Sequence, residues 1–173
     1  MGQLSEPPLY AALRALAQDR HRAFAVAIAM AEIVEPLGEL ASLTPEPLSE
    51  LAGRIRDATN PDQATAEAAV LSAIPALQED EEPEENPAWF ALGAVVAWIY
   101  AAESFGDPAG QRVVNTFARV DDVLEQVEEV LGVPGLCDQF YGAAADAARG
   151  DDAALRAMRG LGRSLLGQLR GVS

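Results

Sequence analysis

The sequence predicts an all-α fold, a single-domain bundle of about six to eight helices that spans residues 1–173. Half of the residues are apolar but only 6% are aromatic, and alanine supplies much of the apolar share. Alanine favours helices and lets them approach closely. Prolines that follow helix-capping residues, and apolar residues spaced by three and four, point the same way. A chain of this length is within the usual size of one domain.

Four pairs of a capping residue and a proline predict where helices begin. A Thr, Asn or Asp oxygen accepts a hydrogen bond from a first-turn amide. Proline at the first helical position lacks an amide that would otherwise be unpaired. The pairs are Thr44-Pro45, Asn60-Pro61, Asn86-Pro87 and Asp107-Pro108. Each pair should open a helix.

Helical periodicity and these pairs divide the chain into a series of expected helices. A first helix is capped by Ser5, and a second runs from Arg20 to Glu35, where Pro36 ends it. The further expected helices cover residues 46–58, 62–74, 87–105, 108–131 and 152–170. Residues 136–149 read as a more broken region.

Two of these helices carry the strongest apolar patterns. Within 108–131 the apolar positions alternate spacings of four and three, which is typical of a helix packed along its whole length. These positions are Val113, Phe117, Val120, Leu124, Val127 and Leu131. The uncharged run from Ala88 to Ala102 is shorter than the ~18–20 apolar residues of a membrane-spanning helix. We therefore expect a buried central helix there and no membrane segment.

Two segments read as exposed or loosely held. Residues 78–86 form a like-charge run without an apolar side chain to bury, so we expect an acidic linker there. Gly160, Gly162 and Gly167 each weaken the last helix by ~1 kcal/mol relative to alanine. These glycines either permit close packing or mark a mobile tail over residues 160–173.

The formal charge of −15 narrows the classes of partner. All twelve basic residues are arginine, and they form no basic patch interleaved with aromatic side chains. Binding to nucleic acid is therefore not expected, and a protein partner with a basic surface fits better. The absence of lysine, beside abundant alanine, glycine and arginine, suggests a GC-rich bacterial genome.

The sequence shows no catalytic constellation. Cys137 is the only cysteine, so it forms no internal disulfide, and no leader-like segment opens the chain. Both features fit a reducing cytoplasm. A lone cysteine is more often a small buried hydrophobe than a reactive thiol. His21, the only histidine, lies among cationic neighbours and would have to serve any Ser-His-Asp or Cys-His site. We therefore favour a protein without enzymatic activity and without a cofactor.

Carboxylate pairs leave one enzymatic alternative open. Glu32 and Glu35 lie one turn apart on an expected helix. Such pairs hold Mg²⁺ in all-helical nucleotide pyrophosphohydrolases, where a second acidic pair follows within a few tens of residues. Here the second pair would have to come from residues 121–129, much further along the chain, and no lysine is present to steady a triphosphate.

An acidic face and an arginine face are the candidate partner-binding surfaces. The acidic face comprises Asp121, Asp122, Glu125, Glu128 and Glu129 near the C-terminus of a helix, where negative charge opposes the helix dipole. The arginine face comprises Arg156, Arg159 and Arg163 on the last helix. We expect the two faces to pair within the chain, and otherwise to meet another protein, for which guanidinium forks give specific carboxylate recognition.

Two stretches carry a similarity to a known family. The first is residues 23–32 (AFAVAIAMAE) with Pro36 after it, and the second is Ile74-Pro75 followed by the acidic linker and the helix at residues 94–103. In these stretches, about half of the chain, the sequence resembles the YjaG-like bacterial family of unknown function. The resemblance implies an all-helical fold and no assigned activity. The tryptophan expected in the third helix of that family is absent from residues 51–56.

The sequence therefore favours a non-enzymatic interaction protein, namely an adaptor, a regulatory subunit or an immunity-type inhibitor. Its charge would speed encounter with a basic protein and disfavour wrong partners. The first alternative is the Mg²⁺-dependent hydrolase described above. The second is a self-associating structural protein, with the helix at 87–105 or the seam at 113–131 forming a homodimer core.

Overall fold

The computed structural model describes residues 8–41, 43, 46–74, 87–132 and 134–172. Within these residues the regular elements are all helical, which confirms the all-α fold. The α-helices are α1 (Pro8–Ala15), α2 (Arg20–Val34), α3 (Leu48–Arg56), α4 (Pro61–Ser72), α5 (Pro87–Ser104), α6 (Gln111–Leu131), α7 (Leu136–Ala148) and α8 (Asp152–Val172). Short 3-10 segments, Leu16–Gln18 and Glu35–Leu40, follow α1 and α2.

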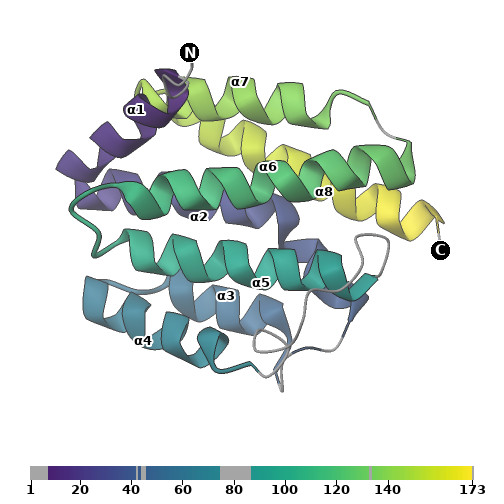
Figure 1. Cartoon of the computed structure of the whole chain (residues 1–173), viewed down its shortest axis with the longest axis horizontal. Helices are drawn as coiled ribbons and strands as arrows, with labels where there is room; N and C mark the ends of the chain where they lie inside the picture. Colours follow the sequence, from purple (N-terminus) through teal and green to yellow (C-terminus); the bar gives the residue numbers. More distant parts are fainter. Residues whose placement is uncertain (1–7, 42, 44–45, 75–86, 133, 173) are drawn as a thin grey trace, which may run out of the picture.

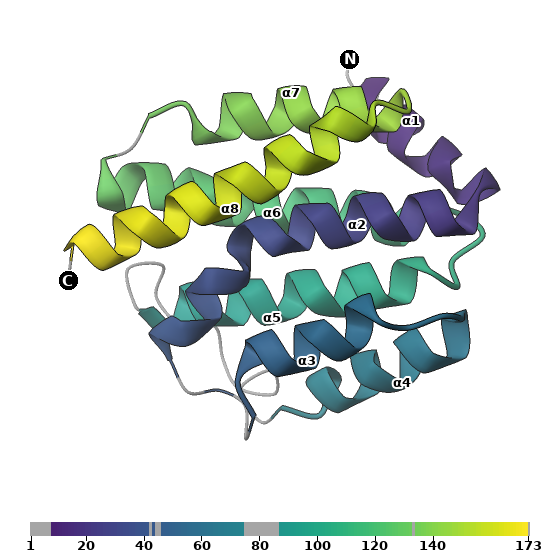
Figure 2. The ribbon, with the colours of Figure 1, turned by 180° about the vertical axis from the view of Figure 1, so that it is seen from behind.

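Helix α2 lies at the centre of the bundle and packs against α5, α6 and α8. Helices α5 and α6 run side by side in one layer, and α2, α8 and α3 lie behind them (Figures 1 and 2). Ten of the fifteen residues of α2 are buried, including Met30 and Ile33. Burying side chains of this size stabilises the fold by ~1.5–3 kcal/mol each. The small side chains of Ala27 and Ala31 allow the neighbouring helices to come close.

Helix α5 is the buried central helix that the uncharged run predicts. Trp98 is fully buried, and Phe105, just after the helix ends, stacks on Phe24 of α2 with 4.3 Å between ring centroids. The side of α5 that faces α6 holds Gly93, where a Cβ would lie 2.5 Å from Cγ2 of Val123. The missing side chain thus sets the close spacing of α5 and α6.

Two of the four capping pairs can be compared in full with the structure. The Asn60 side chain accepts a hydrogen bond from the Gln63 amide at 2.9 Å, and α4 begins at Pro61 as predicted. The pair Asp107-Pro108 does not start a helix, and α6 begins at Gln111 instead. The Asp107 carboxylate still accepts hydrogen bonds, at 3.0 Å from the amide of Ala109 in the turn before α6 and at 2.7 Å from the amide of Arg112 in its first turn.

The later start of α6 follows from a turn that fits tightly under α1. Gly110 adopts φ 74°, and a Cβ at this position would lie 2.4 Å from the carbonyl oxygen of Arg14. Only glycine combines this backbone conformation with this contact. Among the other pairs, Thr44, Pro45 and Asn86 lie outside the described residues; α3 begins at Leu48 and α5 at Pro87.

The C-terminal part is more regular than expected. Residues 136–148 form the continuous helix α7 rather than a broken region, because Phe140, Ala144 and Ala147 bury one face of it. Helix α8 continues through Val172, so residues 160–172 are helical. The expected linker at 78–86 and Ser173 lie outside the described residues.

The candidate homodimer surfaces are used inside the chain. Five residues of the seam on α6 are buried against neighbouring helices: Val113, Phe117, Val120, Leu124 and Val127. Most of α5 is buried as well. Neither helix therefore offers these side chains to a second copy. None of the described helices combines the length and the apolar character that crossing a bilayer requires.

Candidate functional site

The residues singled out in the sequence fall on two parts of the bundle. Glu32, Glu35, Arg159 and Arg163 meet in one pocket between α2, α3 and α8, which we call the α2–α8 pocket. Its lining residues are Glu32, Glu35, Pro36, Arg56, Arg159, Gly162 and Arg163. The acidic residues 121–129 lie on the C-terminal half of α6, outside this pocket.

The α2–α8 pocket lies where α2 ends. Glu32 is in the last turn of α2, and Glu35 and Pro36 open the 3-10 segment that follows. Pro36 has no amide hydrogen to donate to the carbonyl of Glu32, so the α-helical pattern of hydrogen bonds stops here. The two carboxylates, three positions apart, are held at this end of the helix and are mostly buried, with 18% and 21% of their side chains exposed.

Gly162 brings α8 against the end of α2. A Cβ on Gly162 would lie 2.9 Å from the carbonyl oxygen of Glu32 and 3.3 Å from the Cα of Ile33. A residue with a side chain would force the two helix backbones apart. Of the two readings of these glycines, close packing thus holds for Gly162. Arg159 and Arg163, three positions before it and one after, line the same pocket.

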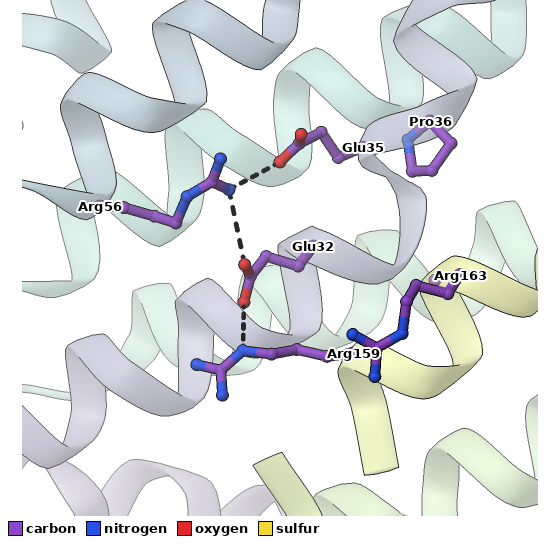
Figure 3. Close-up of a pocket in the computed structure, with 7 residues that line it drawn as sticks. Glu32, Glu35, Pro36, Arg56, Arg159 and Arg163 are labelled. Carbon is purple, nitrogen blue, oxygen red and sulfur yellow. Dashed lines mark hydrogen bonds and ion pairs between the residues drawn. The ribbon is translucent and has the colours of Figure 1, made fainter. Parts of the chain in front are cut away.

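Arg56 of α3 is the residue of this site that sequence reasoning missed. Its Nη1 lies 2.8 Å from Oε1 of Glu35 and 3.5 Å from Oε2 of Glu32 (Figure 3). Its guanidinium group also lies over the ring of the buried Trp98, 5.3 Å from the ring centroid. Arg56 therefore links α2, α3 and α5. The only available signal was a pair of arginines in the last turn of a short amphipathic helix.

Glu32 joins two arginines from different helices. One carboxylate oxygen faces Arg56, and the other accepts from Nε of Arg159 at 3.2 Å. Burial raises the pKa of Glu35 above its ordinary value, and the bond to Arg56 offsets only part of that effect. The network is thus a chain of four charged groups whose carboxylates are only partly accessible to solvent.

Arg163 is the charged residue of the pocket that forms no ion pair with a described residue. Figure 3 shows its guanidinium group directed toward the side where Glu32 and Arg159 meet, with no interaction drawn to it. The pocket has a volume of about 220 Å³. Three guanidinium groups face two carboxylates, so the pocket carries one positive charge in excess.

The proposed metal pair is engaged in ion pairs. Glu32 and Glu35 are bonded to Arg56 and Arg159, and cations of this kind occupy the positions that Mg²⁺ would need. Among the described residues, no group of three or more Asp, Glu, His or Cys side chains is placed to hold a metal ion. The structure therefore does not bring Glu32 and Glu35 together with the acidic residues of α6.

The second candidate surface is the C-terminal half of α6. Asp122, Glu125 and Glu129 are exposed, and their spacing of three and four places them on one side of the helix. We call these three residues the α6 acidic face. None of them forms an ion pair with a described residue, and the last turn of α6 contains no basic side chain. Their charge is thus left to solvent.

Glu128 and Asp121 have partners inside the chain instead. Oε1 of Glu128 accepts a hydrogen bond from the Cys137 amide at 2.7 Å, so this carboxylate caps the N-terminus of α7. The Cys137 thiol lies 3.9 Å from the backbone carbonyl of Asp121. These two acids join α6 to α7. Because they face α7, they are not part of the α6 acidic face.

The acids of α6 repel one another. Burial raises the pKa of Asp121, and the charges of Glu125 and Asp122 raise it further. The pKa of the partly buried Cys137 thiol is raised to about 12 by burial and by the charges of Asp121, Glu128 and Glu125. No described arginine forms an ion pair with these acids.

The expected pairing of the acidic face with the arginine face is not found. Helix α8 packs against α2 and α7, and Arg159 uses Glu32 as its partner. Arg156 is exposed one turn earlier, without an ion pair to a described residue. The two helices that carry these faces lie in different layers, because α6 is in front of α2 and α8 (Figure 1).

Comparison with protein-family models, curated proteins and solved structures found no match to this chain. The resemblance to the YjaG-like family therefore stays a prediction from the sequence.

Proposed function

We propose that this chain is a non-enzymatic interaction protein and that its α6 acidic face docks on the basic surface of a partner protein. The observation that carries the proposal is that Asp122, Glu125 and Glu129 are exposed and form no ion pair with a described residue. Some carboxylates elsewhere in the described structure do pair with arginines, as Glu46 and Glu67 do with Arg54. The α6 acidic face is a place where the chain leaves its own negative charge unbalanced.

The unfavourable electrostatics of the acids on α6 support a binding role. Burial raises the pKa values of Asp121 and Cys137, and repulsion by the neighbouring carboxylates raises them further. Negative charge at the C-terminus of a helix also opposes the helix dipole, by ~0.3–1 kcal/mol for each charge. An arginine or lysine from a partner would offset the repulsion among these acids and their unfavourable interaction with the helix dipole, and both effects favour docking.

The chemistry of the partner follows from the charge. Arginine forks recognise carboxylates with two parallel hydrogen bonds, and α6 presents carboxylates at helical spacing. The formal charge of −15 adds long-range steering toward a basic surface. Because exposed charges separated by more than ~8–10 Å are screened at physiological ionic strength, the association should be fast in low salt and slow in high salt.

The proposal is tested by capture of partners from a native lysate with tagged protein in low and high salt. The variant Glu125→Gln/Glu129→Gln removes two charges from the α6 acidic face. The matched control, Glu50→Gln/Asp57→Asn, removes two exposed charges from α3 and leaves the net charge of the two proteins equal.

We expect a stoichiometric partner that is lost in high salt, and roughly tenfold lower recovery with the α6 variant only. Equal losses with both variants would show that the total charge, not the α6 face, drives binding. Full recovery with the α6 variant would refute the assignment of this face.

A further inference from the structure

The α2–α8 pocket contains an arginine, Arg163, that forms no ion pair with a described residue. Arg163 lines the pocket beside Arg159, one helical turn away on α8. Arg159 uses its Nε for Glu32, so its terminal amino groups are not committed to that bond. Two guanidinium groups thus stand next to one another at the same opening.

The positions of these two arginines are set by packing rather than by chance. Gly162 lies between them in the sequence and is buried in the structure. It packs against the backbone of α2 and so fixes the distance between α8 and the end of α2. Glu32 holds the Arg159 side chain from one side, and Arg56 holds Glu32 from the other. A preorganised pair of guanidinium forks binds an anion at a lower entropic cost than two free side chains.

We propose that the α2–α8 pocket binds the carboxylate group of a small monoanionic ligand between Arg159 and Arg163. One carboxylate balances the single positive charge that the pocket carries in excess. Two parallel N–H to oxygen bonds from a guanidinium group match the planar carboxylate. This site lies away from the α6 acidic face, and the proposal does not depend on docking at that face.

The lining of the pocket selects against phosphate. Glu32 and Glu35 are part of the wall, so a dianion would exceed the available positive charge and meet two negative groups. The volume of about 220 Å³ equals that of roughly seven waters. A carboxylic acid of a few heavy atoms fits this space.

The direct test is a titration of the ¹⁵N-labelled full chain with sodium acetate, followed by NMR of the backbone amides and of the arginine Nε–H groups. Sodium chloride at equal ionic strength is the reference, and sodium phosphate is the competing chemistry. We expect saturable shifts that centre on Arg159, Gly162 and Arg163, with a Kd of roughly 1 mM or weaker for so small a ligand. Phosphate should bind more weakly than acetate.

Two variants make the result specific. Arg163→Gln should weaken acetate binding by about tenfold, which corresponds to ~1.4 kcal/mol. Arg156→Gln removes the same charge from an exposed position on the same helix that does not line the pocket, and should change the Kd by less than about twofold. Both replaced side chains are exposed, so neither variant should unfold the chain.

The source of the carboxylate is distinguished by a second pair of ligands. N-acetylalanine carries the carboxylate of a peptide C-terminus, and its amide lacks that group. Tighter binding of N-acetylalanine than of acetate assigns the site to a chain terminus, and equal binding assigns it to a free small acid. The amide should not bind in either case.

Three results would overturn the proposal. Shifts with acetate that do not exceed those with chloride would show that no site exists. Equal weakening in Arg156→Gln and Arg163→Gln would show only general attraction to α8. A loss of stability in Arg163→Gln without saturable acetate binding would show that Arg163 serves the C-terminal dipole of α2 instead.

Discussion

Replacing Gly162 with alanine tests how closely α8 must approach α2, and Gly160 provides the control on the same helix. An alanine inside a helix is favoured over glycine by ~1 kcal/mol. At position 160 no heavy atom lies within 4 Å of a new Cβ, so Gly160→Ala should gain about that amount. At position 162 the new Cβ would lie 2.9 Å from a backbone oxygen that cannot rotate away.

The expected difference between the two variants follows from these numbers. Overpacking at a rigid contact costs ~1–3 kcal/mol, so Gly162→Ala should change the free energy of unfolding by between ~0 and −2 kcal/mol after the helical gain. The two variants should therefore differ by ~1–3 kcal/mol. Urea unfolding monitored by circular dichroism and by tryptophan fluorescence measures this difference, and coincident transitions establish two-state behaviour.

The stability of Gly162→Ala relative to Gly160→Ala tests whether α8 approaches α2 closely at position 162. If the two alanine variants are equally stable, the close approach of α8 to α2 is wrong, and with it the fixed placement of Arg159 and Arg163. A matched acetate titration adds a second readout. Gly162→Ala should weaken acetate binding because α8 moves outward, and Gly160→Ala should leave it unchanged.

Three further outcomes are expected. With a pKa of about 12 instead of 9.0, the Cys137 thiol should have a roughly thousandfold smaller thiolate fraction at pH 8 than a free thiol, and should react with iodoacetamide much more slowly. Glu128→Gln should speed the reaction, and alkylation of the folded wild type as fast as that of a free thiol would contradict the raised pKa. The pKa of Asp121 is raised in the folded state above 3.8, so wild type loses stability as the pH rises from 3.8 through that raised pKa. Because Asp121→Asn avoids this loss, thermal unfolding should show that the variant becomes more stable than wild type over this pH interval and equals it below pH 3.8. A stability advantage of the variant that is largest at low pH would contradict the raised pKa of Asp121. Finally, Asn60→Ala removes the cap of α4 and should cost ~1 kcal/mol by urea unfolding, whereas a neutral effect would show that the cap is dispensable.

Local signals in the sequence predicted the start of a helix well where residues close in sequence determine it. Asn60 caps α4 through an amide three positions away, so the pattern alone was sufficient. The start of α6 was missed because Gly110 must pass under Arg14, which is remote in the chain. Residues 136–149 looked broken because alanine and glycine give a weak periodic signal, although tertiary packing of Phe140 makes them a helix.

The candidate site shows the same limit more strongly. Glu32 and Arg159 were each singled out, but in different roles, because their separation of 127 positions hides the contact. Arg56 was missed since its partners lie 24 and 21 positions away on another helix. Spacing along one helix identifies which side chains share a face. It does not indicate which other helix that face will meet.

The central position of α2 has a consequence for folding of the chain during its synthesis on the ribosome. The helix is apolar on nearly every side, and its main partners α5, α6 and α8 are all translated later. At ~5–20 residues per second, Arg159 leaves the peptidyl transferase centre roughly ten seconds after Glu32. During this interval a nascent segment of exposed Ala, Val, Ile and Met side chains must stay soluble. We therefore expect the nascent chain, much more than the finished protein, to be a client of ribosome-associated chaperones.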